Sequence, residues 1–323
     1  MDFQVFLFFA LLILGFILLV KGADWLVTGA TSLAKKLDIS ELAIGLTIVA
    51  FGTSAPEMVV NVFAGISKHD EVVFGNVFGS NVMNTLLVLG ISGLIYPTTV
   101  QGRTVWLEIP FSLLGALLIL FFVNDQFIYG SESTILSRWE GIIGFLFFCG
   151  FLYYVANNLR EETISEVERI EVFKLPKTIL LLILGAGGLA VGGRLTVNYA
   201  VDIAYYFNLS EKLIGLTIIA IGTSLPELAT CVIASLKSRS DIAVGNIVGS
   251  NIFNLLLVLP VSAIVSKLNY NESLNLDMGI FMLGTILLFA FTFTNRIRKI
   301  NRWEAATFLL MFIAYFTYLW IRQ

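Results

Sequence analysis

Two short blocks of small, hydroxyl-bearing and acidic residues occur twice in this chain, each time inside apolar sequence. The hexapeptide GTSAPE at Gly52–Glu57 returns as GTSLPE at Gly222–Glu227, 170 residues later. At the same spacing, GNVFGSNVMN from Gly75 returns as GNIVGSNIFN from Gly245. A carboxylate inside an apolar helix is unfavourable and is usually functional. The repeated blocks therefore predict the functional site.

The side chains of these blocks offer oxygen atoms at helical spacing. Thr53 and Ser54 precede Glu57 by four and three residues, and Ser80 precedes Asn84 by four, so each set shares a helix face. The second copy repeats the arrangement with Thr223, Ser224, Glu227, Ser250 and Asn254. Carboxylate, hydroxyl and carbonyl oxygens suit hard cations such as Ca²⁺, Mg²⁺ or Na⁺. The set contains no Cys or His, which argues against zinc or copper.

Pro56 and Pro226 predict that the helix opens beside each carboxylate. Proline lacks an N–H group, and its ring clashes with the carbonyl four residues earlier, which belongs to Gly52 or Gly222. Freed carbonyls are tolerated at membrane depth only where they line a polar cavity. We therefore expect broken helices around a central polar site.

The composition is that of an integral membrane protein. The 323 residues are 57% hydrophobic and only 13% charged, and apolar runs of about 20 residues, enough to cross a bilayer, recur along the chain. Cys149 and Cys231 lie in such runs and are expected to be packing residues. The pattern predicts ten spans with approximate limits 3–34, 40–67, 71–96, 103–123, 138–157, 176–206, 211–236, 241–266, 274–294 and 302–321.

The duplication predicts the topology. Each half holds five spans, an odd number, so the second half enters the bilayer in the opposite sense. We expect an all-α membrane protein of two inverted five-helix repeats, 1–157 and 176–323, joined by a linker at 158–175. Arg138-Trp139-Glu140 and Arg302-Trp303-Glu304 mark the start of the fifth span in each half. Binding sites of such proteins lie at the repeat interface near the bilayer midplane.

The distribution of basic residues predicts the orientation. Thirteen Lys and Arg residues fall in the odd-to-even connections and five on the opposite side. The positive-inside rule then places both termini outside and the Asn157–Lys174 linker in the cytoplasm. This linker is too short to fold as a domain, and the plasma membrane is the expected location.

GTSxPE followed by GNxxGSNxxN, present twice in a five-plus-five membrane protein, resembles the sodium/calcium exchanger branch of the calcium/cation antiporter superfamily, in its prokaryotic form without a large regulatory loop. The resemblance implies a central cluster of four cation sites. It also implies that the first and sixth spans slide across a rigid core. The implied ligands are the carbonyls of Ala50 and Ala220 and the side chains of Thr53, Ser54, Glu57, Ser80, Asn84, Thr223, Ser224, Glu227, Ser250 and Asn254.

One departure from the family pattern bears on the coupling ion. Several relatives have Asp at the last motif position of the second repeat, and the potassium-dependent branch uses it, whereas Asn84 and Asn254 are both neutral here. The proton/calcium branch has a different core motif, which lacks GTSxPE. Na⁺ coupling is therefore expected, with K⁺ or H⁺ coupling as the alternatives.

Three further charges lie within predicted spans, namely Lys21, Asp24 and Arg194. Pairing or snorkelling at a span's end is the expected role, with gating or proton relay as the alternative. Asp24 and Arg194 occupy equivalent repeat positions with opposite charge, which allows pairing across the pseudo-two-fold axis.

Three function classes compete for this pattern. A secondary antiporter explains the duplication, the inversion and the paired carboxylates. A channel more naturally surrounds a pore with symmetric subunits. An enzyme needs a nucleophile with a base or a metal, and the only histidine, His69, lies in a predicted outer loop. We expect a monomeric antiporter in the lipid bilayer that carries Ca²⁺ and Na⁺ as substrates, with no prosthetic group and no nucleic-acid partner.

Overall fold

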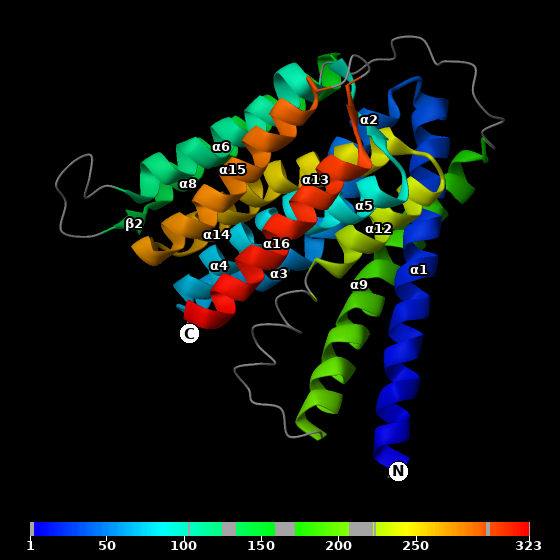
Figure 1. The fold of residues 1–323 in the computed structure, drawn as a ribbon, viewed down its shortest axis with the longest axis horizontal. Coiled ribbons are helices and arrows are strands. Elements are labelled where there is room, and N and C mark those ends of the chain that lie inside the picture. The colour runs from blue at the N-terminus through cyan, green and yellow to red at the C-terminus, as the bar shows by residue number, and fades with distance from the viewer. Residues whose placement is uncertain are drawn as a thin grey trace.

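The computed structural model describes residues 3–102, 104–124, 134–158, 172–206, 222, 224–294 and 298–322, and this part of the chain is mainly helical. Figure 1 shows a bundle of inclined helices crossed by two steeper ones. The first half contains α1 (Phe3–Leu37), α2 (Glu41–Ile44), η1 (Gly45–Val49), α3 (Ala50–Ile66), α4 (Asp70–Val82), η2 (Met83–Val88), α5 (Leu89–Ile95), β1 (Thr98–Thr99), η3 (Thr104–Glu108), α6 (Ile109–Val123), β2 (Ile135–Leu136) and α8 (Arg138–Asn158).

The described part of the second half follows the order of elements of the first half, beginning with a long helix. It contains α9 (Leu175–Tyr206), α12 (Leu225–Leu236), α13 (Ser240–Phe253), η5 (Asn254–Val258), α14 (Leu259–Val265), β3 (Leu268–Asn269), η6 (Glu272–Leu274), α15 (Asn275–Phe291), β4 (Lys299–Ile300) and α16 (Arg302–Arg322). Segments η1, η2, η3 and η5 are π-helical turns within longer helices.

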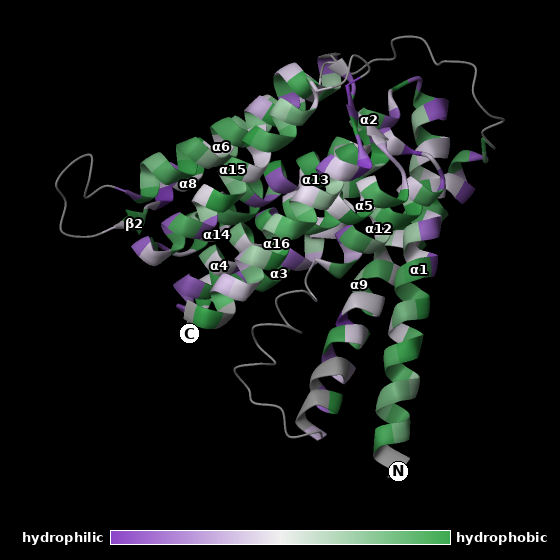
Figure 2. Ribbon diagram, viewed as in Figure 1, coloured by the Kyte–Doolittle hydropathy of each residue, from purple (hydrophilic) through white to green (hydrophobic). Residues whose placement is uncertain are grey.

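Eight helical segments of the described chain are long and apolar enough to cross a membrane. They correspond to the first six, the eighth and the ninth predicted spans. Figure 2 shows hydrophobic residues along α1, α6 and α8, and many of these side chains, such as Phe6 and Leu146, are exposed on the outside of the protein. The protein is therefore a multi-pass membrane protein whose apolar outer surface suits contact with lipid.

The other two predicted spans differ from these eight. Of the seventh span, the structure describes a helix only at Leu225–Leu236, because residues 207–221 lie outside the described part. The tenth corresponds to α16, a helix of 21 residues that is not among the eight apolar segments. The count of ten thus stays a prediction.

Two short antiparallel strand pairs join the halves of the chain. Strand β1 pairs with β4, with Thr98 opposite Ile300, and β2 pairs with β3, with Ile135 opposite Asn269. Strands β1 and β3 occupy equivalent repeat positions, as do β2 and β4. Each pair is therefore the repeat-related copy of the other, as expected for two halves related by a pseudo-two-fold axis.

Helices α1 and α9 lie side by side and run at a steep angle to the rest of the bundle (Figure 1). Glycines bring their backbones together: a Cβ atom on Gly22 would lie 2.7 Å from the Leu189 amide nitrogen, and one on Gly185 would lie 2.6 Å from that of Leu26. Small residues allow such close helix contacts in membranes. These two helices form a tightly packed pair.

The repeated Arg-Trp-Glu sequence caps a helix in each half. The Glu140 carboxylate accepts from the Ser137 amide at 2.7 Å, while Ser137 Oγ accepts from the Glu140 amide at 3.4 Å. In the second half, the Glu304 carboxylate accepts from the Asn301 amide at 2.5 Å. These contacts satisfy backbone groups at the start of α8 and α16, so these glutamates have a structural role.

Candidate cation-binding site

The repeated blocks meet in the middle of the bundle. Helix α13 is buried along almost its whole length and packs against η1 and α3. Two glycines make this possible: a Cβ atom on Gly245 would lie 2.9 Å from the Gly45 Cα, and one on Gly249 would lie 2.8 Å from the Leu46 oxygen. The small residues of the second block thus let α13 approach the backbone that precedes the first block.

The structure describes ten of the twelve predicted site residues, and each of the ten is at most 4% exposed. Ala220 and Thr223 lie outside the described residues. The ten are Ala50, Thr53, Ser54, Glu57, Ser80, Asn84, Ser224, Glu227, Ser250 and Asn254.

Direct contacts join the two repeats within this set. Ser54 Oγ donates to Glu227 Oε1 at 3.0 Å, across 173 residues of sequence. Thr53 Oγ1 lies 3.5 Å from Ser250 Oγ and 3.2 Å from the Ala50 carbonyl oxygen. Glu57 and Glu227 are both buried on helices that contact each other, α3 and α12, so ionised carboxylates at these two positions repel each other. The structure therefore brings predicted residues from both halves into one polar cluster.

The cluster contains buried oxygens without hydrogen-bond partners. A buried polar atom left unpaired costs about 1–3 kcal/mol, and more if it is charged, so each such atom needs an explanation such as a bound ion. Within the described part of the chain, the unpaired atoms include Glu57 Oε1 and Oε2, Ser80 Oγ, Asn84 Oδ1, Ser224 Oγ, Glu227 Oε2 and Asn254 Oδ1. These seven atoms belong to predicted ligands, and buried unpaired atoms also occur outside the predicted set, such as Thr31 Oγ1 and Thr230 Oγ1.

The chemistry of this set suits a hard cation. Two carboxylates supply at most two negative charges, while the hydroxyl and amide oxygens supply neutral ligands. Among the described residues, no group of three or more His, Cys, Asp or Glu side chains is placed to hold a metal ion. The arrangement can compensate the charge of one divalent cation with oxygen ligands alone.

The two carboxylates differ in their local structure. Helix α3 continues through Pro56, so the predicted opening at that residue is wrong, and the irregular turn is the π-helical segment η1 just before Ala50. In the second repeat α12 begins at Leu225, which places Pro226 in the first turn, where its missing N–H is tolerated. Proline is accommodated in both places, but only the second lies at a helix start.

Further π-helical turns lie at the asparagines of the second block. Segment η2 begins at Met83, next to Asn84, and η5 begins at Asn254. A π-helical turn shifts the helical register by one residue and is frequent at functional sites. Its presence at equivalent positions in both halves indicates a feature of the repeat.

Several polar residues beside the cluster were not predicted as site residues. Asn246 accepts from Thr53 Oγ1 at 3.1 Å through its Oδ1 and donates to Cys231 Sγ at 3.2 Å through its Nδ2. Cys231 therefore takes part in a polar network and is more than a packing residue. Asn81 and Asn251 bond to the site asparagines. Asn81, Asn246 and Asn251 all belong to the repeated GNxxGSNxxN motif, so the repeat itself was the sequence signal that could have pointed to them.

The intramembrane charges pair differently from the prediction. Asp24 Oδ1 lies 2.6 Å from Lys237 Nζ, which also donates to Thr28 Oγ1 at 2.8 Å. Pairing of Asp24 with Arg194 is thus wrong: Lys237 is the ion-pair partner, and the Arg194 residue is exposed. The Asp24–Lys237 bridge links α1 to the end of α12.

Comparison with known proteins gives consistent matches over the whole chain. A family model described as sodium/calcium exchanger protein matches residues 7–157 and 177–321. A putative antiporter, CaxA of Alkalimonas amylolytica, is 38% identical over 309 residues, covering 94% of this chain and 95% of that protein. The sodium/calcium exchanger MaX1 of Methanosarcina acetivorans is 30% identical over 341 residues, covering 95% and 97%.

Solved structures give the same result. The sodium-calcium exchanger NCX_Mj, soaked with zero Na⁺ and Ca²⁺, superposes with a TM-score of 0.81 at 30% identity over 98% of this chain and 99% of that one. Its form soaked with 2.5 mM Na⁺ and 10 mM Sr²⁺ superposes with a TM-score of 0.79. On the family model, the relatives and the fold together, this chain belongs to the sodium/calcium exchanger family and is a transmembrane cation/Ca²⁺ antiporter.

Proposed function

We propose that the protein exchanges Na⁺ for Ca²⁺ by alternating access, with both ions bound in turn by the buried oxygen cluster. The observation that carries the proposal is the set of unpaired oxygens contributed by both repeats, from Glu57 and Ser80 in one half to Glu227 and Asn254 in the other. Ala220 and Thr223, which lie outside the described residues, complete the ligand set by repeat symmetry with Ala50 and Thr53.

The charge of the cluster supports exchange between these two ions. A buried ion needs compensating charge and hydrogen-bonding or coordinating partners. Two carboxylates neutralise one Ca²⁺, and the same oxygens can instead hold several Na⁺ ions, because both are hard cations. Competition for a shared set of ligands couples the two fluxes, since the ions cannot occupy it together.

The α1–α9 pair is the element that moves in this proposal. Helix α9 borders both copies of the first block: a Cβ atom on Gly52 would lie 3.6 Å from the Ala186 Cβ, and one on Gly193 would lie 3.6 Å from the Pro226 Cγ. These contacts, and a closer one between a Cβ atom on Gly222 and the Val197 Cγ2, involve side-chain atoms, whereas α1 and α9 approach each other with backbone atoms. A pair that is joined through its backbones and meets the core through side chains can slide as a unit and expose the cluster to either side.

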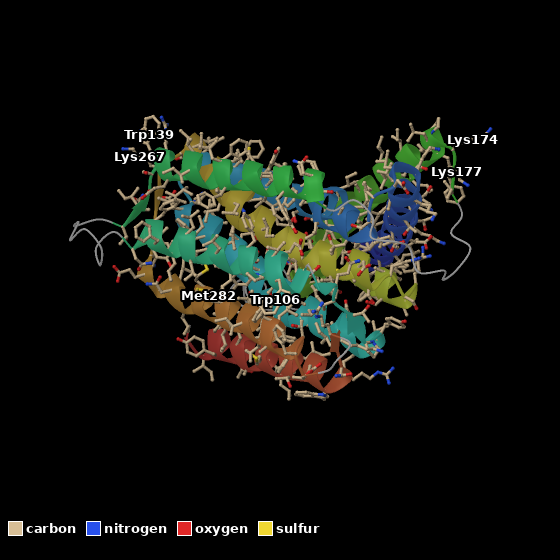
Figure 3. The ribbon with its side chains drawn as sticks, turned by 90° about the horizontal axis from the view of Figure 1, so that it is seen from above. Trp106, Trp139, Lys174, Lys177, Lys267 and Met282 are labelled. Carbon is tan, nitrogen blue, oxygen red and sulfur yellow. The ribbon has the colours of Figure 1, made fainter. Side chains whose placement is uncertain are left out.

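The proposed topology has ten spans, with both termini outside and the linker in the cytoplasm. Strand pairing supports it, because β1 and β4 belong to loops assigned to the cytoplasmic side, and β2 and β3 to loops assigned to the outer side. In Figure 3, Trp139 and Lys267 lie together at one end of the molecule and Lys174 and Lys177 at the other. We place the protein in the plasma membrane as a monomer.

Transport into proteoliposomes tests the proposal. Purified protein is reconstituted, and ⁴⁵Ca²⁺ uptake is measured with an outward gradient of Na⁺, K⁺ or H⁺ in separate samples. We expect rapid, saturable uptake with Na⁺ and little with the other two. Uptake that depends on H⁺ or K⁺ instead identifies a different coupling ion, and uptake that never saturates and needs no counter-ion indicates a channel.

A further inference from the structure

The carbonyl oxygens of Asn84 and Asn254 are buried and have no hydrogen-bond partner among the described residues, whereas their amide nitrogens are hydrogen-bonded. Asn84 Nδ2 donates to Asn251 Oδ1 at 3.3 Å, and Asn254 Nδ2 donates to Asn81 Oδ1 at 3.1 Å. The two bonds are repeat-related copies, since 84 corresponds to 254 and 81 to 251. All four side chains are buried.

The orientation of these amides decides whether a cation is attracted or repelled. The oxygen and nitrogen ends of an asparagine amide have nearly the same shape, so hydrogen bonds determine which end points where. If the amide of Asn84 turned over, its NH₂ group would replace the unpaired oxygen, and its oxygen would face Asn251 Oδ1, an acceptor. The Asn251 side chain therefore disfavours the flipped amide of Asn84, and the Asn81 side chain disfavours the flipped amide of Asn254.

The support of the two positions is unequal. Asn251 Nδ2 donates to Thr85 Oγ1 at 2.9 Å. The residue equivalent to Thr85 in the second repeat is Leu255, which has no hydroxyl group. Asn81 Nδ2 instead donates to the Asn251 carbonyl oxygen at 3.4 Å. Asn251 is therefore fixed by the side chain of Thr85, whereas Asn81 relies on a longer bond to the backbone.

We infer that Asn81 and Asn251 are positioning residues: each holds the amide of the site asparagine in the other repeat so that its carbonyl oxygen faces the cation, and Thr85 supports Asn251 in this role. Neither is among the proposed ligands. The inference rests on the proposed function, because it assumes that Asn84 and Asn254 bind the cation. It predicts that each positioning residue affects ion binding only through its own partner.

Double-mutant cycles on the full-length protein test this prediction. Ca²⁺ affinity is measured by calorimetry on purified protein, and the Ca²⁺-dependent rise in unfolding temperature provides a second readout that still detects weak binding. Loss of one hydrogen bond predicts that Asn251→Ala weakens Ca²⁺ binding about 3- to 10-fold. In an Asn84→Ala background, the further effect of Asn251→Ala should fall within about twofold.

The other repeat provides the matched control. In an Asn254→Ala background, Asn251→Ala should keep its full effect, and the reverse should hold for Asn81→Ala, whose effect should disappear only with Asn254→Ala. A purely structural role would lower affinity or thermal stability equally in both backgrounds. An undiminished effect of Asn251→Ala in the Asn84→Ala background overturns the inference.

A milder substitution covers the case in which an alanine variant fails to fold. Thr85→Val removes the hydroxyl that supports Asn251 and should weaken Ca²⁺ binding about 2- to 5-fold in wild type but not with Asn84→Ala. Leu255→Val, at the equivalent position, should leave the affinity unchanged. If the wild-type protein binds no Ca²⁺, the proposed function fails; if it binds Ca²⁺ and these effects are additive, only the positioning role fails.

Discussion

Replacing Glu57 by Gln should abolish high-affinity Ca²⁺ binding without weakening the ion-free protein. Both carboxylate oxygens of Glu57 are buried and lack a partner among the described residues, so the change breaks no hydrogen bond seen there. It also removes the repulsion between Glu57 and Glu227. Glu227→Gln is a less clean test, because it also disturbs the bond from Ser54.

The size of the effect follows from the charge removed. At about 4 Å and an effective dielectric constant of about 20, a divalent cation and a single negative charge attract each other by about 8 kcal/mol. The amide oxygen of glutamine and the change in desolvation offset part of this attraction. If half is lost, about 4 kcal/mol, the affinity falls about a thousandfold.

Calorimetric titration of purified protein with Ca²⁺, together with thermal unfolding with and without Ca²⁺, measures both parts of this prediction. Glu140→Gln is the matched control, because Glu140 is a helix-capping glutamate and its replacement should leave Ca²⁺ affinity unchanged. Ca²⁺ binding by Glu57→Gln within about threefold of wild type, less than 1 kcal/mol, would refute the electrostatic reasoning.

Three further predictions follow from the same geometry. If the same two carboxylates bind three Na⁺ or one Ca²⁺, each exchange cycle moves one net charge across the membrane. The transport rate in proteoliposomes should then depend on a clamped membrane potential, which contributes about 2.3 kcal/mol per 100 mV to each cycle. A rate that does not depend on the potential would indicate a 2:1 ratio or a protonated glutamate. Ca²⁺ uptake should proceed without K⁺, and Asn254→Asp should alter the ion dependence more than the unfolding temperature, whereas a K⁺ requirement in wild type contradicts the role given to Asn254. Gly22→Ala should lower the free energy of unfolding by about 1–3 kcal/mol, because the added methyl group meets the Leu189 backbone. Gly187→Ala should leave it unchanged, because no described atom lies within 4 Å of the added methyl group. Equal unfolding temperatures for the two variants would show that the α1–α9 packing adapts.

The sequence was sufficient to predict that the repeated polar residues come together inside the protein. One apolar residue in a membrane helix can be replaced by another without loss of its role. Two copies of the same polar block therefore identify the positions at which the type of side chain matters. Glu57 and Glu227 are buried in one cluster, as the repeat predicts. The eight apolar segments also follow the predicted spans, because hydropathy over about 20 residues is a strong signal in membrane proteins.

Details that depend on local backbone geometry were not predictable. Proline rules predicted an opening at Pro56, yet the irregular segment η1 ends at Val49, about two helical turns earlier. The motif contains several asparagines, and helical spacing alone does not distinguish Asn84, whose buried oxygen is unpaired, from Asn81, whose oxygen accepts a hydrogen bond from Asn254. In the same way, Asp24 pairs with Lys237, 213 residues away, because packing of α1 on α12 decides which charges meet.

Crystallographic location of Sr²⁺ tests the central claim most directly, because Sr²⁺ is a hard divalent cation that prefers oxygen ligands, as Ca²⁺ does, and scatters anomalously. Crystals soaked in Sr²⁺ at low Na⁺ should show an anomalous peak within coordination distance of both Glu57 and Glu227, and the peak should disappear at high Na⁺. A peak elsewhere in the protein, or one at this position that persists when Na⁺ is in large excess, would contradict the account.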